Sequence, residues 1–350
     1  MSIKLKQLAA HLGLSQTTVS RALNGYPEVN EETRQRVLEA VRETGYRPNK
    51  AAQRLATGRA GSIGLVMPVA AGIETDVHFS SFLSGLGEAA QRHDVHLVIN
   101  PSSPEEEETT FRRLAASGNV DALFIAHVRR EDPRIPMLRT LQIPYMVHGR
   151  AIGQGEDYPF LDIDNEGAFY DAARLLIDLG HRRIGLINGQ EQLTFSIRRE
   201  TGMKKALLEA GLPVEDLPID YGFMTDEFGY RAATRFLEAT VPPTAILCSS
   251  TVIALGAVRA LNRAGLKIGE DVSLIAHDDV LPLLKPEHFS VPLTTTTSSL
   301  RAAGARVAER LIASREQPSD APPEQELWRT ELIRRESTGP APRVPRSARI

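Results

Sequence analysis

Residues 12–25 read LGLSQTTVSRALNG, and this stretch decides how the first part of the chain folds. Gly13 is expected to end one helix, and Ser15 is a favoured N-cap for a second helix over residues 16–23. Helical spacing turns three apolar side chains of the second helix inward, namely Val19, Ala22 and Leu23. Its opposite face then carries short hydrogen-bonding groups, one cation and no acid. Such a face suits a partner that is anionic and has edges to be read.

Further helices are expected on both sides of this stretch. In the segment before it, apolar residues recur at helical spacing, at Leu5, Leu8, Ala9 and Leu12. The segment after it begins at Asn30, a good N-cap, has two glutamates where the helix dipole favours acids, and ends before Gly45. Its buried stripe is expected to be Val37, Leu38 and Val41. Two short helices joined by a tight turn and braced by a third make a helix-turn-helix.

The outward face of residues 16–23 suits DNA. A glutamine can pair bidentately with adenine, an arginine can pair with guanine, and a threonine methyl can pack on a thymine methyl. Short hydroxyls and amides suit phosphate oxygens, which position the helix without reading sequence. We therefore expect DNA contacts from Gln16, Thr17, Thr18, Ser20, Arg21 and Asn24. The alternative is a solvated polar helix with a good cap.

Charge is distributed unevenly along the chain. Residues 1–60 hold three lysines and seven arginines against five glutamates, a net charge of +5. The whole chain carries −3, so the remainder carries −8. A basic head on an acidic body indicates that the head alone meets a polyanion such as nucleic acid.

The composition is that of an ordinary globular chain of two or three domains, with 350 residues, 42% hydrophobic and 24% charged side chains. The single cysteine, Cys248, rules out an internal disulfide and is typical of a reducing compartment. The first residues, MSIKLKQLAAHLGLSQ, do not resemble a signal peptide because polar residues interrupt every apolar run. No stretch approaches about 18 apolar residues, so we expect no membrane span and a cytoplasmic location.

Beyond Gly61, short apolar runs alternate with helical segments. A first set of runs comprises SIGLVMP, HLVIN, ALFIA and YMVHG, and a second set comprises RIGLING, LPIDYG, AILCSS and VSLIAHDD. This alternation predicts parallel sheets covered by helices on both faces. Two such sets predict two lobes, with a ligand cleft at the carboxyl ends of their strands.

The sequence LKQLAAHLGLSQTTVSRALNG, followed by VNEETRQRVLEAVRETGYRPNKAAQRLA, closely resembles the head of the lactose-repressor family of bacterial transcription regulators. The resemblance implies that residues 47–58, RPNKAAQRLATG, form a hinge helix that orders on DNA and enters the minor groove. Asn49 matches a polar position near the start of the family hinge, and Leu55 matches the leucine that wedges between base pairs. Such wedges unstack a step and kink the duplex. The alternative is a plain linker, because this segment is too short to be a stable free helix.

The resemblance also implies an architecture for the whole chain. An all-α three-helix helix-turn-helix head and a hinge helix precede a two-lobed α/β core, which is periplasmic-binding-protein-like and has parallel sheets. The chain is expected to cross between the lobes near residues 162–164, 290–293 and 321–324. The expected parts are a head at 1–46, a hinge and linker at 47–61, a first lobe at 62–161 with 293–322, a second lobe at 162–292 with 323–338, and a disordered tail at 339–350.

The same resemblance implies which residues bind a small-molecule effector in the core. Asp278 would accept hydrogen bonds from ligand hydroxyls, Arg199 would donate into the same cleft, and Phe79 would stack on a sugar face. The further candidates are His78, His148, Arg150, Met224 and Ser250. His78 and His148 are also compatible with ordinary loop residues.

One departure and one likeness bear on the identity of the ligand. Many family members have Ala-Asn-Asp where this chain has Ser249-Ser250-Thr251, and a hydroxyl offers fewer hydrogen bonds than an amide. The segments TDVHFSSFLSGLGEAA, from residue 75, and VHGR, from residue 147, are similar to repressors of alpha-glucoside uptake operons. This likeness favours a disaccharide or a related sugar as effector.

The function that the sequence favours is that of a DNA-binding repressor controlled by a sugar. We expect a homodimer, with a tetramer as an alternative, on double-stranded operator DNA, and no cofactor. An enzyme or a sugar-binding protein with the same α/β core is the competing interpretation, although no GxxxxGK[ST] loop, GxGxxG after a first strand or nucleophile elbow is present. The adjacent His277, Asp278 and Asp279 are not expected to converge on a metal ion. Whether the effector releases DNA or promotes binding stays open.

Overall fold

The computed structural model describes most of the chain as two compact units, residues 1–60 and 61–350. The described residues are 3–23, 25–46, 59–68, 76–314 and 322–343. In this part of the chain, no helix combines the length and the hydropathy that a bilayer span requires.

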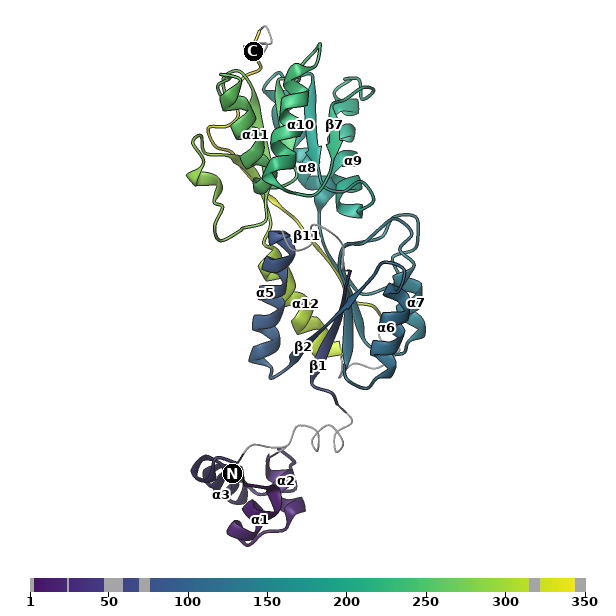
Figure 1. The fold of residues 1–350 in the computed structure, drawn as a ribbon, viewed down its shortest axis with the longest axis vertical. Coiled ribbons are helices and arrows are strands. Elements are labelled where there is room, and N and C mark those ends of the chain that lie inside the picture. Colours follow the sequence, from purple (N-terminus) through teal and green to yellow (C-terminus); the bar gives the residue numbers. More distant parts are fainter. Residues whose placement is uncertain (1–2, 24, 47–58, 69–75, 315–321, 344–350) are drawn as a thin grey trace. The chain divides into compact units, whose positions relative to one another are not determined.

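The first unit contains α1 (Leu5–Leu12), α2 (Gln16–Leu23) and α3 (Glu31–Thr44), which Figure 1 draws in purple. Gly13 and Gly45 end α1 and α3 in the left-handed conformation, at φ of 66° and 63°. Asn30 caps α3 by accepting a hydrogen bond from the backbone N–H of Thr33 at 2.8 Å. The small core contains the fully buried Leu8, Val19 and Val37. The predicted helix-turn-helix is confirmed.

The first lobe of the second unit is built on a six-stranded parallel sheet in the order β11-β5-β4-β3-β1-β2. Helices α5 (Val77–Arg92) and α12 (Leu300–Ala313) cover one face of this sheet, and α6 (Glu107–Ala116) and α7 (Arg134–Thr140) cover the other (Figure 1). The strands are β1 (Ser62–Pro68), β2 (His96–Ser102), β3 (Ala122–Ile125), β4 (Tyr145–His148), β5 (Phe160–Ile163) and β11 (Gln325–Trp328).

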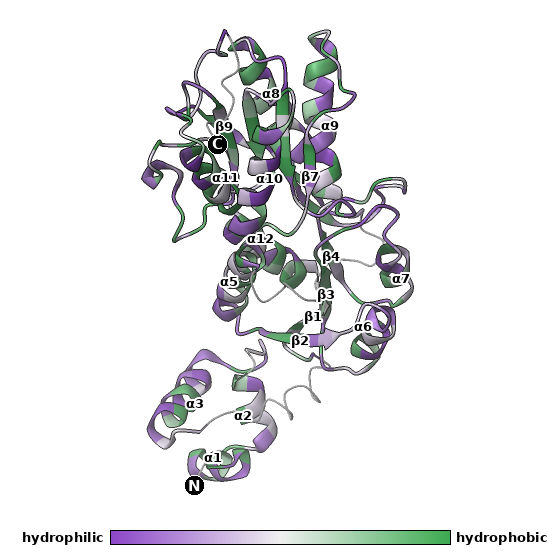
Figure 2. Cartoon of the chain, turned by 45° about the horizontal axis from the view of Figure 1, so that its top comes forward, coloured by the Kyte–Doolittle hydropathy of each residue, from purple (hydrophilic) through white to green (hydrophobic). Residues whose placement is uncertain are grey.

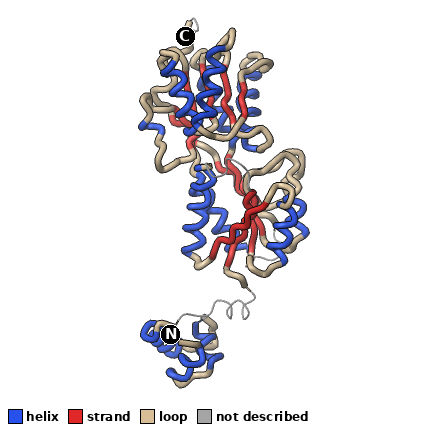
Figure 3. The backbone as a smooth tube through the Cα atoms, in the orientation of Figure 1, coloured by secondary structure: helices blue, strands red, loops and turns tan. Residues whose placement is uncertain are grey.

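The second lobe repeats this plan with the strand order β12-β10-β9-β8-β6-β7, in which only β12 runs antiparallel to its neighbour. Figure 3 shows helices in front of and behind its strands. Helices α8 (Asn165–Asp178) and α9 (Thr194–Glu209) cover one face, and α10 (Asp226–Glu238) and α11 (Thr251–Arg263) cover the other. The strands are β6 (Ile184–Asn188), β7 (Ile219–Tyr221), β8 (Ala245–Cys248), β9 (Ser273–Asp278), β10 (Thr294–Thr297) and β12 (Glu331–Ile333), and a short 3-10 helix, η2, spans Pro286–His288.

The apolar side chains of the strands explain why helices cover both faces of each sheet. Successive residues of β8 point to opposite faces: Leu247 packs with α8 and α9, whereas Ile246 and Cys248 pack with α10 and α11. Figure 2 shows largely hydrophobic strands between helices that mix hydrophobic and hydrophilic residues. A parallel sheet buried on both faces requires this pattern, and the predicted α/β core is confirmed.

The structure shifts the predicted crossings between the lobes. The strand β10 pairs with β9 of the second lobe, so the chain returns to the first lobe after Thr297 rather than at residue 293. The strand β11 pairs with β5 of the first lobe, so the last crossing lies between Trp328 and Glu331 rather than near 321–324. The first crossing follows Ile163, the last residue of β5. The runs TTTT and QELW are too short, and hold too few apolar residues, for the sequence to assign them to either sheet.

The expected disordered tail is also wrong for its first residues. The carbonyl of Gly339 lies 3.2 Å from the hydroxyl of Ser273 and from Nε2 of His181, and the N–H of Ala341 donates to the carbonyl of Leu179. These partners are buried or backbone groups of the second lobe, so residues 339–341 pack on it. Residues 344–350 lie outside the described part of the chain.

Candidate functional site

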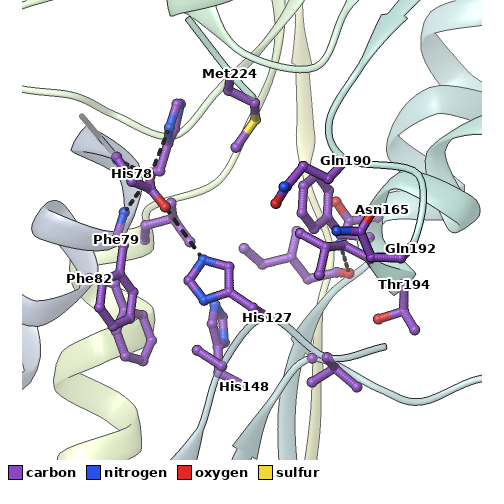
Figure 4. A pocket seen from close by; sticks show the side chains of 18 of the residues that line it. His78, Phe79, Phe82, His127, His148, Asn165, Gln190, Gln192, Thr194 and Met224 are labelled. Carbon is purple, nitrogen blue, oxygen red and sulfur yellow. Dashed lines mark hydrogen bonds and ion pairs between the residues drawn. The ribbon is translucent and has the colours of Figure 1, made fainter. Parts of the chain in front are cut away.

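A cavity of about 420 Å³ opens where the carboxyl ends of the strands of the two lobes meet. Its size is typical of small-molecule sites, which span about 300–1,000 Å³, and a two-lobed α/β fold places ligands at this edge of its sheets. Figure 4 labels five aromatic side chains on one side of the cavity, from the first lobe, and amide and hydroxyl side chains on the other. The polar side comes from α8 and from the segment that precedes and begins α9, and its labelled side chains are Asn165, Gln190, Gln192 and Thr194.

The aromatic side of the cavity is a stack of four rings from the first lobe. The rings of Phe79 and Phe82, one turn apart on α5, stack with centroids 6.4 Å apart. His148, at the end of β4, stacks on Phe82 at 4.6 Å, and His127 tilts against Phe79 at 5.1 Å. Burial lowers the pKa of His148 to about 4, so its ring is neutral. Its Nδ1 lies 3.2 Å from the carbonyl of Leu161, which fixes the ring against the stack.

A row of acids and histidines connects the two lobes beside this stack. Asp76 caps α5 by accepting hydrogen bonds from the N–H groups of His78 and Phe79. The imidazole of His78 lies between two carboxylates, 3.5 Å from Asp76 and 3.4 Å from Asp279 of the second lobe. Burial alone would lower the pKa of His78, but the hydrogen bond to Asp76 and the negative charge of Asp279 raise it above its ordinary value.

Arg199 on α9 lines the part of the cavity that the second lobe forms. Its Nε donates to the side-chain oxygen of Asn165 at 2.8 Å, and Nη1 donates to the carbonyl of Ser249. The guanidinium lies over the rings of Phe169 and Phe195, at 5.2 and 4.9 Å from their centroids. Burial lowers the pKa of Arg199 to about 10, so it remains a cation at neutral pH.

Five of the eight predicted effector residues line the cavity, namely His78, Phe79, His148, Arg199 and Met224. Arg150 is not a lining residue. Its Nε donates to Asp162 at 2.9 Å, and Asp162 lines the cavity. Ser250 caps α11 by accepting a hydrogen bond from the N–H of Ile253.

Asp278 does not line the cavity. Its carboxylate accepts a hydrogen bond from the N–H of Val280 at 2.8 Å and so closes the turn after β9. The next residue, Asp279, lines the cavity instead. Side chains alternate along a strand, so a shift of one residue moves the carboxylate to the other side.

Sequence reasoning missed further lining residues that share one signal. Each comes shortly after the carboxyl end of a predicted strand, or at the start of the helix that follows it, where ligands gather in this class of fold. His127 follows β3, Gln190 follows β6 and Asp279 follows β9. The remaining polar ones are Asp76, Arg129, Asn165, Gln192, Thr194 and Thr225, and Asp162, inside β5, is the exception to this rule.

The described residues include no group of three His, Cys, Asp or Glu side chains arranged to hold a metal ion. His277 precedes Asp278 and Asp279 at the end of β9, but its two ring nitrogens lie 2.9 Å from the hydroxyls of Thr296 and Ser298. This histidine is therefore part of the packing between β9 and β10.

The first unit presents the second candidate surface, on α2. Gln16, Thr17 and Arg21 are exposed, whereas Val19 and Ala22 on the opposite face are buried. Thr18 and Ser20 are partly buried, and the hydroxyl of Thr18 lies 2.8 Å from that of Ser15. Three other candidates for DNA contact lie outside the described residues: Asn24, Asn49 and Leu55.

Comparison with known families matches both units. Residues 4–49 match the family "Bacterial regulatory proteins, lacI family", and residues 173–338 match "Periplasmic binding protein-like domain". The HTH-type transcriptional regulator AglR of Rhizobium meliloti (strain 1021) is 71% identical over 342 residues, which cover 98% of this chain and 96% of that protein. The HTH-type transcriptional regulator CelR of Thermobifida fusca is 30% identical over 95% of this chain and 97% of its own length.

Solved structures share the fold over nearly the whole chain. A complex of the transcriptional regulator CelR with cellobiose superposes with a TM-score of 0.70 at 28% identity, covering 96% of this chain and 99% of that one. A lac repressor dimer bound to operator and the anti-inducer ONPF superposes with a TM-score of 0.80 at 23% identity, covering 97% and 100%. The second likeness concerns the fold alone.

Proposed function

The chain belongs to the lacI family of bacterial regulatory proteins and is a helix-turn-helix, DNA-binding transcriptional regulator, and we propose that it represses a sugar-utilisation operon under the control of a neutral disaccharide. The observation that carries the proposal is the cavity between the lobes, in which an aromatic stack faces a polar side. An aromatic face can cover the apolar side of a sugar ring while amides, carboxylates and a guanidinium bind its hydroxyls.

The charges around the cavity favour a neutral ligand. The positive groups among its described lining residues already have acidic or polar partners: His78 lies between two carboxylates, Arg199 donates to Asn165, and Arg129 pairs with Glu107 at 3.2 Å. Three carboxylates line the same space: Asp76, Asp162 and Asp279. A phosphorylated sugar would bring its negative charge close to these acids, so it would bind less well than a neutral one.

One observation favours an alpha-glucoside, and a second favours a disaccharide more generally. The segments that resemble alpha-glucoside repressors form α5 and the end of β4, and these elements carry Phe79, Phe82 and His148 onto the cavity. The related regulator CelR forms a complex with cellobiose, which is a disaccharide. The cavity of about 420 Å³ has room for a ligand of that class.

Assembly and location follow from the DNA-binding function. One helix-turn-helix reads few base pairs, whereas two related by a two-fold axis read a pseudo-palindromic operator, so we propose a homodimer. A tetramer remains an alternative. A regulator of this kind acts where bacterial DNA lies, in the cytoplasm, and we assign it no catalytic reaction.

The test is operator binding with candidate effectors. Fluorescence anisotropy of labelled operator is measured with the purified protein in the presence of maltose, sucrose, trehalose or cellobiose, with glucose 6-phosphate as the charged control. We expect one neutral disaccharide to change operator affinity about 5- to 150-fold, the usual range of such coupling. A response to glucose 6-phosphate alone, or to none of the neutral sugars, would contradict the proposed effector class.

A further inference from the structure

The two lobes touch at the edge of the cavity through a loop of the first lobe. Residues 126–133 connect β3 to α7, and the carbonyl of Val128 in this loop accepts a hydrogen bond from the N–H of Thr194 at 2.9 Å. Arg129 also forms an isolated β-bridge with Leu193. Thr194 is the first residue of α9, and an N–H in the first turn of a helix has no acceptor within that helix. The first lobe therefore supplies the acceptor for this second-lobe amide.

The same loop has a backbone shape that its residues do not favour. His127 and Glu131 adopt positive φ values of 53° and 48°. For residues other than glycine this conformation is uncommon, and it persists where surrounding contacts impose it. The ring of His127 lines the cavity (Figure 4), so the shape of the loop determines both a cavity wall and the contact between the lobes.

A buried ion cluster beneath the loop supplies the contacts that impose this shape. Arg134, Asp132 and Glu107 are each at most 5% exposed. The guanidinium of Arg134 donates to both carboxylate oxygens of Asp132, at 2.9 and 2.6 Å, and to Glu107 at 2.9 Å. It also donates to the carbonyls of Ala126 and His127, at 3.2 and 3.0 Å.

Asp132 extends this cluster to the part of the loop that meets the second lobe. It accepts a hydrogen bond from the N–H of Arg129 at 3.0 Å, and Arg129 is the residue directly after Val128. The side chain of Arg129 donates to Glu107 as well, at 3.2 Å. The cluster thus holds the loop on both sides of the Val128 carbonyl.

We propose that Arg134 is a positioning residue for the closure of the two lobes. It fixes the loop so that the carbonyl of Val128 receives the N–H of Thr194, and this bond couples closure around the effector to the change in operator affinity. The coupling to an effector rests on the proposed function, whereas the positioning of the loop does not.

The positioning is tested on the free protein by amide hydrogen exchange. Arg134→Lys keeps the positive charge but cannot reach the acceptors that the planar guanidinium binds together. Exchange at the Thr194 amide should be about tenfold faster in this variant, because local opening frees the N–H. Arg112→Lys is the control, since among the described residues Arg112 pairs only with the exposed Glu108 on α6. Unchanged exchange at Thr194 in Arg134→Lys, with the variant folded, would overturn the proposal.

The coupling is tested by a substitution that removes the backbone N–H of Thr194. Proline is well tolerated at the first position of a helix, and Leu193 before it has φ −86° and ψ 134°, which a following proline accepts. Thr194→Pro therefore deletes the donor and leaves the start of α9 intact, and Thr194→Ala is the matched control, which loses the hydroxyl and keeps the N–H.

The response to maltose, sucrose, trehalose and cellobiose is measured in two ways. Calorimetry gives the sugar affinity, and anisotropy of labelled operator gives the operator affinity. Relative to Thr194→Ala, Thr194→Pro should bind the active sugar about threefold to tenfold more weakly, and the sugar should change its operator affinity less. Equal responses of the two variants would overturn the coupling. If the wild-type protein responds to none of these sugars, the proposed function fails, and hydrogen exchange still decides the role of Arg134.

Discussion

His78 and Asp279 face each other across the two lobes, with Nε2 of the imidazole 3.4 Å from the nearer carboxylate oxygen. Both side chains are about 5% exposed, so little water screens their interaction. Asp76 contacts the other ring nitrogen of His78, and His277 lies 3.5 Å from the second oxygen of Asp279. A change in the protonation of His78 therefore acts on the contact between the lobes, next to the cavity.

We expect His78 to make the stability of the core depend on pH. Its pKa is raised above 6.5 in the folded protein, because Asp76 and Asp279 outweigh the effect of burial. A histidine of this kind stabilises the fold fully below about pH 6.5, and the contribution is lost as the pH rises through the raised folded pKa. His78→Gln should lower the free energy of unfolding at pH 6 by about 1–3 kcal/mol, because Asp279 loses its charged partner.

The measurement is urea unfolding of both proteins at pH 6 and at pH 9. The difference between wild type and His78→Gln should be larger at pH 6. His93→Gln, at the exposed end of the same helix, is the control and should show no such difference. An equal loss of stability for His78→Gln at both pH values would mean that the imidazole contributes packing and not charge.

The second prediction distinguishes the roles of Asp278 and Asp279, the two acids at the end of β9. Asp279→Asn should weaken binding of the active sugar by about 1–3 kcal/mol, because this carboxylate lines the cavity and charged hydrogen-bond partners contribute that much. Asp278→Asn changes a carboxylate that holds the N–H of Val280, so its effect on sugar binding should be small. Titration calorimetry on both variants is the measurement. A large loss for Asp278→Asn with none for Asp279→Asn would restore the assignment made from the sequence.

These two acids also illustrate how far the sequence determines the site. The strand-end rule predicts that ligand-binding residues follow an apolar run, and it locates the segment HDD correctly. It does not determine which of two adjacent carboxylates turns into the cavity, because that depends on the turn that Val280 closes at φ 57°. Family resemblance selected Asp278, and the register differs by one residue.

The head was more predictable than the lobes for a physical reason. Its helix ends depend on local signals, such as the Asn30 cap and the left-handed Gly13, which lie within a few residues of what they control. The assignment of β10 and β11 to their sheets depends on pairing with β9 and β5, which are distant in sequence. The cross-lobe role of the loop around His127 likewise requires the folded structure, because its partner Thr194 lies far along the chain.

The third prediction concerns Arg21, which is exposed on α2. If its guanidinium pairs with a guanine, Arg21→Ala should cost about 1–3 kcal/mol of operator affinity and relax the preference at one base pair per half-site. Binding to a panel of single-substitution operators is the measurement. Arg42→Ala, an exposed arginine of α3, serves as the control for loss of one positive charge. A uniform loss across the panel for Arg21→Ala would make it a phosphate contact.

The last prediction concerns two glycines of α5, the helix that carries His78, Phe79 and Phe82 onto the cavity. A Cβ at Gly85 would lie 1.8 Å from the backbone carbonyl oxygen of Arg301 on α12, so α5 and α12 can approach this closely only with glycine there. A Cβ at Gly87 would meet only the end of the Leu97 side chain, at 3.7 Å, an ordinary contact.

Gly87→Ala should therefore stabilise the protein by up to about 1 kcal/mol, since alanine is the better helix former. Gly85→Ala should destabilise it by about 1–3 kcal/mol or more, because the added methyl forces the backbones apart and outweighs that gain. Urea unfolding measures both effects. Because the same displacement moves the aromatic stack, Gly85→Ala should also weaken sugar binding, whereas Gly87→Ala should leave it unchanged. A Gly85→Ala protein as stable as Gly87→Ala would show that α5 can shift on α12 without cost, and the aromatic wall would then not be fixed by this helix contact.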